Sequence, residues 1–220
     1  KFWKYLMEKE LQKRILSSII IIPLSLFFIV KGSAFFILFI TILFLIACLE
    51  WLKMTKRYDF KIFGIIFLLL SFFSVYLIRD IGLFEFLMIF IICIATDIGG
   101  YIFGKIFKGP KLIKISPNKT YTGVVGGLLM SVGVAFLFNA KYDNYFLENQ
   151  NFLSNLFFII TVFLISSVSQ VGDLIISYFK RESNIKDTGN LFPGHGGLLD
   201  RIDGIIFAIP ISYLLIIFLK

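Results

Sequence analysis

Long, uninterrupted apolar segments dominate this 220-residue chain and restrict what it can fold into. Seven of them lie at roughly 15–30, 34–52, 60–78, 83–106, 121–138, 152–178 and 203–219. Only 16% of the residues are charged, against about 25% in soluble domains, so the lipid bilayer is the expected solvent. Backbone groups in hydrocarbon must bond to one another, and runs without polar alternation favour helices over a barrel. We therefore expect an all-α, polytopic integral membrane protein with about seven transmembrane helices.

Positive charge is concentrated in alternate connections between these segments. Of the 22 Lys and Arg residues, 18 lie in 1–14, 53–61, 105–119 and 180–201. Because cytoplasmic loops carry the excess of Lys and Arg, we expect a cytoplasmic N-terminus. The net charge of +8 has two explanations. It reflects this topology alone, or the loops 105–119 and 180–201 also collect an anionic substrate.

The polar tract from Ser177 to Asp203 lies between the last two apolar segments and contains the only histidine, His195. Such a charged, glycine-rich tract predicts an active site at a membrane surface. Three glycines flank His195 and permit the close approach of a ligand. We expect His195 to donate to a phosphate or to carry a proton, and the alternative is an ordinary loop histidine.

Three aspartates in or beside apolar segments predict a metal site. Asp173 lies inside the sixth segment, where an uncompensated carboxylate costs roughly 2.5–3.5 kcal/mol. Asp200 and Asp203 have the spacing of one helix face at the start of the last helix. Together the three offer oxygen ligands that suit Mg²⁺, and a second cation is left open. The alternatives are an acidic first turn that satisfies the helix dipole and, for Asp173 and Asp97, an ion pair between helices.

Two further polar positions are interpreted from local sequence. Ser116 followed by Pro117 predicts the start of a helix, with Lys119 and Thr120 in its first turn beside free amides. This is a phosphate cradle or an ordinary capped helix. Glu50, at the end of the second apolar segment, is expected to be interfacial and outside the site.

The polar tracts resemble the signature of bacterial phosphatidate cytidylyltransferases, also called CDP-diacylglycerol synthases. The matching residues are Ser177, Phe179-Lys180-Arg181, Lys186-Asp187, Gly189, Phe192-Pro193, His195-Gly196-Gly197-Leu198 and Asp200-Arg201-Ile202-Asp203. Further matches are Asp97-x-Gly99-x-Tyr101-x-x-Gly104-Lys105, Ser116-Pro117-x-Lys119-Thr120 and Gly172-Asp173-Leu174. The chain departs from the family at Thr122, where Glu or Gln is usual, and at Ile176, where Glu is frequent. It also begins with Lys1 rather than Met, so we expect the natural chain to start earlier.

The resemblance implies that the chain transfers the cytidylyl group of CTP to phosphatidate, giving CDP-diacylglycerol and pyrophosphate. It implies a multi-pass protein of the bacterial inner membrane, active on the cytoplasmic side with Mg²⁺ and as a homodimer, without a nucleic-acid partner. We expect an N-terminal transmembrane region at 1–82, of about three helices, and a catalytic region at 83–220 with cytoplasmic loops 105–120 and 179–202.

The expected site residues follow from the matched motifs. Catalytic roles fall to Asp173, Lys180, Arg181, Lys186, Asp187, His195, Asp200, Arg201 and Asp203. Substrate binding falls to Ser116, Lys119, Thr120, Ser177, Gly196, Gly197 and Asp97, and metal binding to Asp173, Asp200 and Asp203. One alternative is cytidylyl transfer to another lipid phosphate. The other is a cation-coupled transporter, for which the paired halves of such proteins are not seen.

Overall fold

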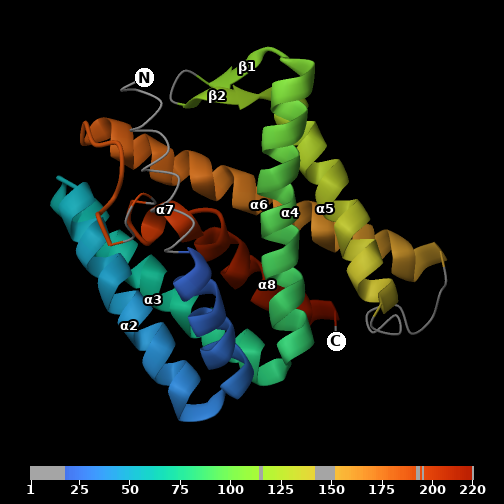
Figure 1. Ribbon diagram of the computed structural model, residues 1–220, viewed down its shortest axis with the longest axis horizontal. Helices are drawn as coiled ribbons and strands as arrows, with labels where there is room; N and C mark the ends of the chain where they lie inside the picture. The colour runs from blue at the N-terminus through green and yellow to red at the C-terminus, as the bar shows by residue number, and fades with distance from the viewer. Residues whose placement is uncertain (1–17, 114–115, 142–151, 192–193, 195, 220) are drawn as a thin grey trace. The chain divides into compact units, whose positions relative to one another are not determined.

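The computed structural model is predominantly helical and describes residues 18–113, 116–141, 152–191, 194 and 196–219 (Figure 1). A short apolar helix, Ser18–Lys31, comes first. It is followed by α2 (Ser33–Met54), α3 (Tyr58–Ile81), α4 (Leu83–Phe107), α5 (Tyr121–Lys141), α6 (Phe152–Glu182), α7 (Leu199–Ile202) and α8 (Ile205–Leu219). Between α4 and α5 the chain forms an antiparallel hairpin of β1 (Lys111–Ile113) and β2 (Ser116–Thr120).

Five helices of the described chain are long and apolar enough to cross a membrane, namely α2, α3, α4, α5 and most of α6. The helices Ser18–Lys31 and Ile205–Phe218 are apolar but shorter. At 1.5 Å per residue, the 15 residues of α8 span about 22 Å, less than a 30 Å hydrocarbon core. Large apolar side chains such as Ile20, Phe63 and Leu137 stay exposed on these helices, as a lipid-facing surface requires. A predominantly helical chain with several membrane-length helices agrees with the prediction. A helix lies at each of the seven predicted segments, and the count of about seven transmembrane helices stays a prediction.

The chain folds into two compact units, each made of two segments. The first unit comprises Lys1–Tyr76 and Phe179–Ile202, and the second comprises Leu77–Tyr178 and Asp203–Lys220. The polar tract that follows α6 therefore packs with the N-terminal helices α2 and α3. The sequence instead predicts that this tract belongs to the C-terminal region, 83–220.

The expected last helix is interrupted between Asp200 and Asp203. Asp200 lies in the single turn α7, Asp203 lies in the following turn, and α8 begins at Ile205. Oδ1 of Asp203 accepts the N–H of Gly204 at 2.9 Å, a local bond that competes with helix formation. A Cβ at Gly204 would lie only 2.4 Å from Oγ of Ser169. The prediction that both carboxylates share one helix face is wrong, because the spacing implies a common face only within a continuous helix.

The predicted helix start at Ser116 is also wrong. Residues 116–120 form β2, in which Thr120 pairs with Lys111 and Ser116 pairs with Ile113. Helix α5 begins at Tyr121, and the hydroxyl of Thr120 caps it by accepting the N–H of Gly123 at 3.1 Å. Residues 116–120, which were expected to form the first turn of the helix, are paired as a strand instead. The residue that caps α5 is therefore Thr120, the last residue of β2, and not Ser116.

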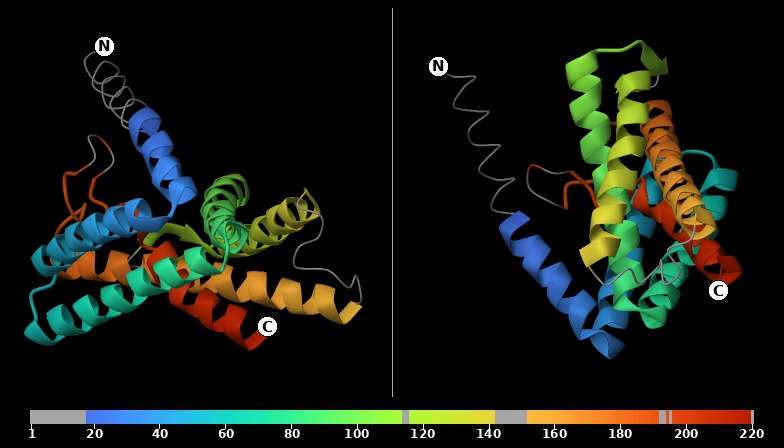
Figure 2. Two further views of the ribbon diagram at one scale, coloured as in Figure 1. Left: turned by 90° about the horizontal axis from the view of Figure 1, so that it is seen from below. Right: turned by 90° about the vertical axis from the view of Figure 1, so that its right-hand side faces the viewer.

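Helices α4 and α5 run side by side and approach each other backbone to backbone (Figures 1 and 2). A Cβ at Gly99 would lie 2.7 Å from the carbonyl oxygen of Gly126, and a Cβ at Gly127 would lie 2.8 Å from that of Thr96. Small residues allow such close packing between helices in membranes. This contact holds α4 and α5 close together within the second unit.

Replacing Gly127 with alanine is expected to destabilise the protein by about 1–3 kcal/mol, because the added methyl group meets backbone that cannot rotate away. Gly133→Ala in the same helix is the matched control, since nothing in the described chain lies within 4 Å of its added Cβ. Thermal unfolding of both variants in the same detergent measures the difference. Equal unfolding temperatures for the two variants would contradict the close contact.

Candidate active site

A cavity of about 510 Å³ lies within the second unit, among α4, the hairpin, α5 and α6. It has an apolar part, which includes Leu112, Val124 and Leu128, and a polar part. The polar and charged side chains that line it are Thr96, Asp97, Tyr101, Ser116, Lys119, Thr120, Ser167, Gln170 and Asp173. Five residues predicted for the site, from three separate parts of the sequence, are therefore brought to one cavity: Asp97, Ser116, Lys119, Thr120 and Asp173.

The charged pair of this cavity is Lys119 of β2 with Asp173 of α6. The two side chains form a salt bridge and keep 26% and 28% of their surface exposed. Oδ1 of Asp173 also accepts the hydroxyl of Ser177 at 3.3 Å. The expectation that Asp173 needs a compensating contact is confirmed, and the contact is a cation from the hairpin. An ammonium has three donors, so Lys119 keeps donors available for a ligand.

The two departures from the family pattern have structural roles in this unit. Thr122 accepts the N–H of Gly109 at 3.2 Å and lies 3.1 Å from the hydroxyl of Thr120, so it ties the start of α5 to the chain before the hairpin. Ile176 is fully buried. Neither residue lines the cavity.

In the first unit, Asp200 organises the tract between α6 and α7. Its Oδ1 accepts the ammonium of Lys180 at 2.8 Å, and the side chains of Lys180 and Asp200 are 17% and 5% exposed. Its Oδ2 accepts the N–H of Thr188 at 2.8 Å and the N–H of Gly197 at 3.0 Å, and it lies 3.1 Å from the hydroxyl oxygen of Thr188. Both oxygens are therefore bonded within the protein.

These contacts also determine the ionisation of Asp200. Partial burial by itself would raise the pKa of the carboxyl group. Hydrogen bonds from Lys180, Gly197 and Thr188, together with the charge of Lys180, outweigh that effect and hold the pKa below its ordinary value. Asp200 is consequently an anion at neutral pH and pairs with the cation that the sequence predicted as catalytic.

Glu50 is part of the same network, although the sequence placed it outside the site. Only 6% of the residue is exposed, and its carboxylate accepts the N–H groups of Leu198 and Leu199 and the hydroxyl of Thr188, each at 2.8 Å. Glu50 is thus buried and bonded to the polar tract, whereas the sequence predicted an interfacial position outside the site. One signal was available, namely a carboxylate within a strongly apolar segment, which predicts a buried partner.

The remaining predicted residues of the tract differ in their environment. Arg181, Lys186, Asp187 and Arg201 are exposed. Gly196 adopts φ 84°, and a Cβ there would lie 2.8 Å from Oδ2 of Asp200, so a glycine is required at this turn. His195 lies outside the described residues, and its role stays a prediction.

The three predicted metal ligands, Asp173, Asp200 and Asp203, lie in different parts of the structure. In the described part of each unit, no three His, Cys, Asp or Glu residues come together as a metal site. Asp173 and Asp203 belong to the second unit and Asp200 to the first. Their carboxylate oxygens are the ligands that Mg²⁺ prefers, and Asp173 lines a cavity beside a second carboxylate, Asp97. The chemistry of these side chains suits a magnesium ion, and a site formed by the three of them stays a prediction.

A family model described as "Cytidylyltransferase family" matches residues 60–219. The chain belongs to the cytidylyltransferase family. Its relatives include a phosphatidate cytidylyltransferase of Rickettsia felis, 34% identical over 213 residues that cover 94% of this chain and 92% of the relative. A phosphatidate cytidylyltransferase of Haemophilus influenzae is 43% identical over 130 residues, 59% of this chain and 44% of the relative. Glu50, which belongs to the network around Asp200 in this cytidylyltransferase, lies before the range that the family model matches.

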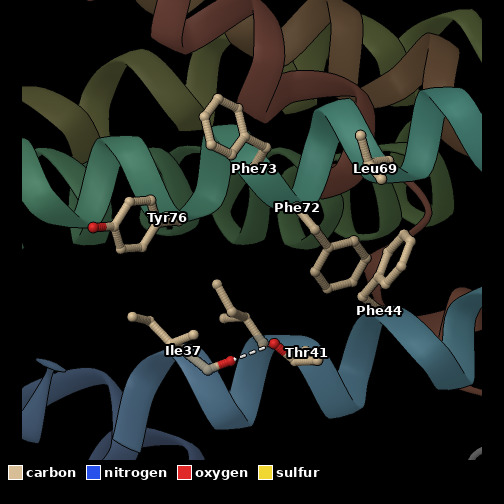
Figure 3. A pocket seen from close by; sticks show the side chains of 8 residues that line it. Ile37, Thr41, Phe44, Leu69, Phe72, Phe73 and Tyr76 are labelled. Carbon is tan, nitrogen blue, oxygen red and sulfur yellow. Dashed lines mark hydrogen bonds between the residues drawn. The ribbon is translucent and has the colours of Figure 1, made fainter. Parts of the chain in front are cut away.

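A second cavity, of about 320 Å³, lies between α2 and α3 in the first unit (Figure 3). Its lining is apolar and aromatic, with Phe44 and Phe72 in edge-to-face contact at 5.7 Å between ring centroids. The hydroxyl of Thr41 donates to the carbonyl oxygen of Ile37 in its own helix. This cavity carries none of the charged groups that cytidylyl transfer requires.

Replacing Asp200 with asparagine is expected to lower the unfolding temperature by about 3–12 °C at neutral pH, because hydrogen bonds to an anion are lost. The pKa of Asp200 is lower in the folded than in the unfolded chain. Its contribution is therefore complete above the ordinary pKa of about 3.9 and is lost as the pH falls through the folded value. The temperature difference between wild type and variant should stay constant from pH 8 to pH 5 and shrink in stronger acid.

Thermal unfolding across that pH range measures this difference. Asp59→Asn is the matched control, because the Arg57–Asp59 pair is exposed, at 63% and 80%, and such pairs contribute little. A difference that falls steadily between pH 8 and pH 6 would contradict the lowered pKa of Asp200.

Proposed function

We propose that this cytidylyltransferase uses CTP and phosphatidate to form CDP-diacylglycerol and pyrophosphate. The observation that carries the proposal is the likeness to the phosphatidate cytidylyltransferase of Rickettsia felis across 94% of this chain and 92% of that relative. The cavity beside Lys119 and Asp173 supports it, since a phosphate group needs cationic donors and a lipid substrate needs access from the membrane.

The reaction requires alignment of the two substrates and neutralisation of their phosphate charges, and it does not require a strong general base. The phosphate of phosphatidate is already an anionic nucleophile, and it attacks the α-phosphorus of CTP as pyrophosphate leaves. Lys119 lies in the cavity and offers its ammonium donors to phosphate oxygens, while its partner Asp173 holds it in place. Lys180, held by Asp200, and the exposed Arg181 and Arg201 add positive charge for the triphosphate.

Asp173, Asp200 and Asp203 are the residues that would hold Mg²⁺. Bound there, the ion would neutralise charge on the triphosphate and on the departing pyrophosphate. Asp97, Ser116 and Thr120 line the same cavity as Asp173. The hydroxyl groups of Ser116 and Thr120 donate to phosphate oxygens, and the carboxylate of Asp97 orients the cations or joins the metal shell. Lys186, Asp187, His195, Gly196 and Gly197 complete the proposed tract.

The topology belongs to the same proposal. The five long helices and the two shorter apolar helices all cross the inner membrane of a bacterium in this proposal. The N-terminus and the polar connections then lie on the cytoplasmic side, where CTP is available. The distribution of Lys and Arg supports this orientation. The enzyme acts as a homodimer. A different lipid phosphate is the second candidate substrate, since the same headgroup chemistry would serve it.

Purified protein in mixed micelles is expected to release pyrophosphate when phosphatidate, CTP and Mg²⁺ are all present. Omitting any one component, adding EDTA or replacing CTP with ATP should abolish the release. Release with an isoprenoid glycerol phosphate in place of phosphatidate would favour the second candidate. A folded sample that releases no pyrophosphate with either lipid would contradict the proposed function.

Lys119→Met is expected to lower kcat/KM about 100-fold or more, because a phosphate-neutralising cation in a partly enclosed cavity is lost. Lys111→Met is the matched control, because Lys111 lies in the neighbouring strand but does not line the cavity. Steady-state pyrophosphate release measures both variants. Equal losses would show that Lys119 acts only through the overall charge of the hairpin.

A further inference from the structure

Glu50 of α2 lies where the polar tract between α6 and α7 folds back on itself. We propose that Glu50 is a positioning residue, which holds this tract in the conformation that brings Asp200 to Lys180. The inference rests on the proposed function to the extent that Asp200 and Lys180 serve cytidylyl transfer. It concerns a residue more than 100 positions before the tract that it orders.

Three consecutive backbone amides donate to two different carboxylates, those of Asp200 and Glu50. The N–H of Gly197 donates to Asp200 at 3.0 Å, whereas the N–H groups of Leu198 and Leu199 donate to Glu50 at 2.8 Å each. The first amides of a helical turn have no partner within the helix. Since α7 has only four residues, it cannot persist alone, and Glu50 supplies acceptors at its start.

Thr188 lies within hydrogen-bonding distance of both carboxylates. Its hydroxyl lies 2.8 Å from Oε2 of Glu50 and 3.1 Å from Oδ2 of Asp200, and its backbone N–H donates to Asp200 at 2.8 Å. The hydroxyl has one hydrogen, so it donates to one carboxylate at a time. Displacement of Glu50 therefore frees the Thr188 hydroxyl and the amides of Leu198 and Leu199, which directly follow the Gly197 amide that donates to Asp200.

Two glycines of the tract lie close to the carboxylate of Glu50. A Cβ at Gly189 would lie 2.6 Å from Oε1 of Glu50, and a Cβ at Gly197 would lie 2.6 Å from both carboxylate oxygens. These two glycines of the tract leave the space that the Glu50 carboxylate occupies. The tract is shaped around this side chain as well as bonded to it.

The part of α2 that carries Glu50 is held in place by the neighbouring residue, Trp51. The indole of Trp51, next to Glu50, donates to the carbonyl oxygen of Phe60 at 2.9 Å, and its ring packs on Phe179 at 4.9 Å between centroids. A buried carboxylate is costly unless it is fully bonded, and apolar side chains stabilise a core as well or better. A carboxylate at this position therefore serves the conformation of the tract.

Glu50→Gln tests the proposal, because one of two accepting oxygens becomes an NH₂ group that faces N–H and O–H donors. We expect kcat for pyrophosphate release to fall about 10- to 100-fold, the worth of hydrogen bonds to a charged group, with KM for CTP changed less than about threefold. Amide hydrogen exchange at Leu198 and Leu199 should accelerate. The matched control is Glu182→Gln, at an exposed position at the end of α6, with wild-type kcat and exchange.

Thr188→Val and Thr188→Ser provide an independent pair. The valine variant lacks the hydroxyl and is expected to accelerate exchange in the tract and lower kcat, whereas serine restores the hydroxyl and the protection. This pair decides the question where Glu50→Gln fails to fold.

Wild-type exchange in Glu50→Gln, or accelerated exchange with an unchanged kcat, would overturn the proposal. A loss confined to KM would also overturn it, since that outcome assigns Glu50 to substrate binding. Absence of pyrophosphate release from the wild-type protein would instead reject the proposed function. The exchange measurement then still decides whether Glu50 orders the tract.

Discussion

Charged groups in a mostly apolar chain have to be neutralised within the protein, and this requirement underlies the arrangement of both units. In the second unit, Asp173 of a membrane-length helix is paired with Lys119 from the hairpin. In the first, Asp200 is paired with Lys180. Each pair joins a helix to a polar connection, so the electrostatic cost of a carboxylate in a low-dielectric region determines where that connection lies.

The two pairs differ in what they leave available. Lys119 and Asp173 line a cavity and are about a quarter exposed, which suits groups that meet a ligand. The oxygens of Asp200 are occupied by Lys180, Thr188 and Gly197, which suits a group that fixes a conformation. A cytidylyltransferase needs both, because positioned cations lower the barrier only when they are held before the phosphates arrive.

Sequence reasoning predicted the features that depend on local composition. The apolar runs predicted the helices, and the cost of Asp173 in its segment predicted a partner. Features set by competition between neighbours were missed: strand pairing at Ser116 replaced a helix start, and the Asp203–Gly204 turn interrupted the last helix. Glu50 was missed because its partners lie 138 to 149 residues further along the chain, a distance over which spacing carries no information.

The most direct test of cytidylyl transfer follows the two ends of the CTP triphosphate separately. Membranes that contain the protein are supplied with phosphatidate, Mg²⁺ and CTP labelled at either the α- or the γ-phosphorus, and the lipid and aqueous phases are counted. Cytidylyl transfer predicts that the α-label enters the lipid phase and that the γ-label is recovered as pyrophosphate. Transfer of the γ-label to lipid, or of neither label, would contradict it.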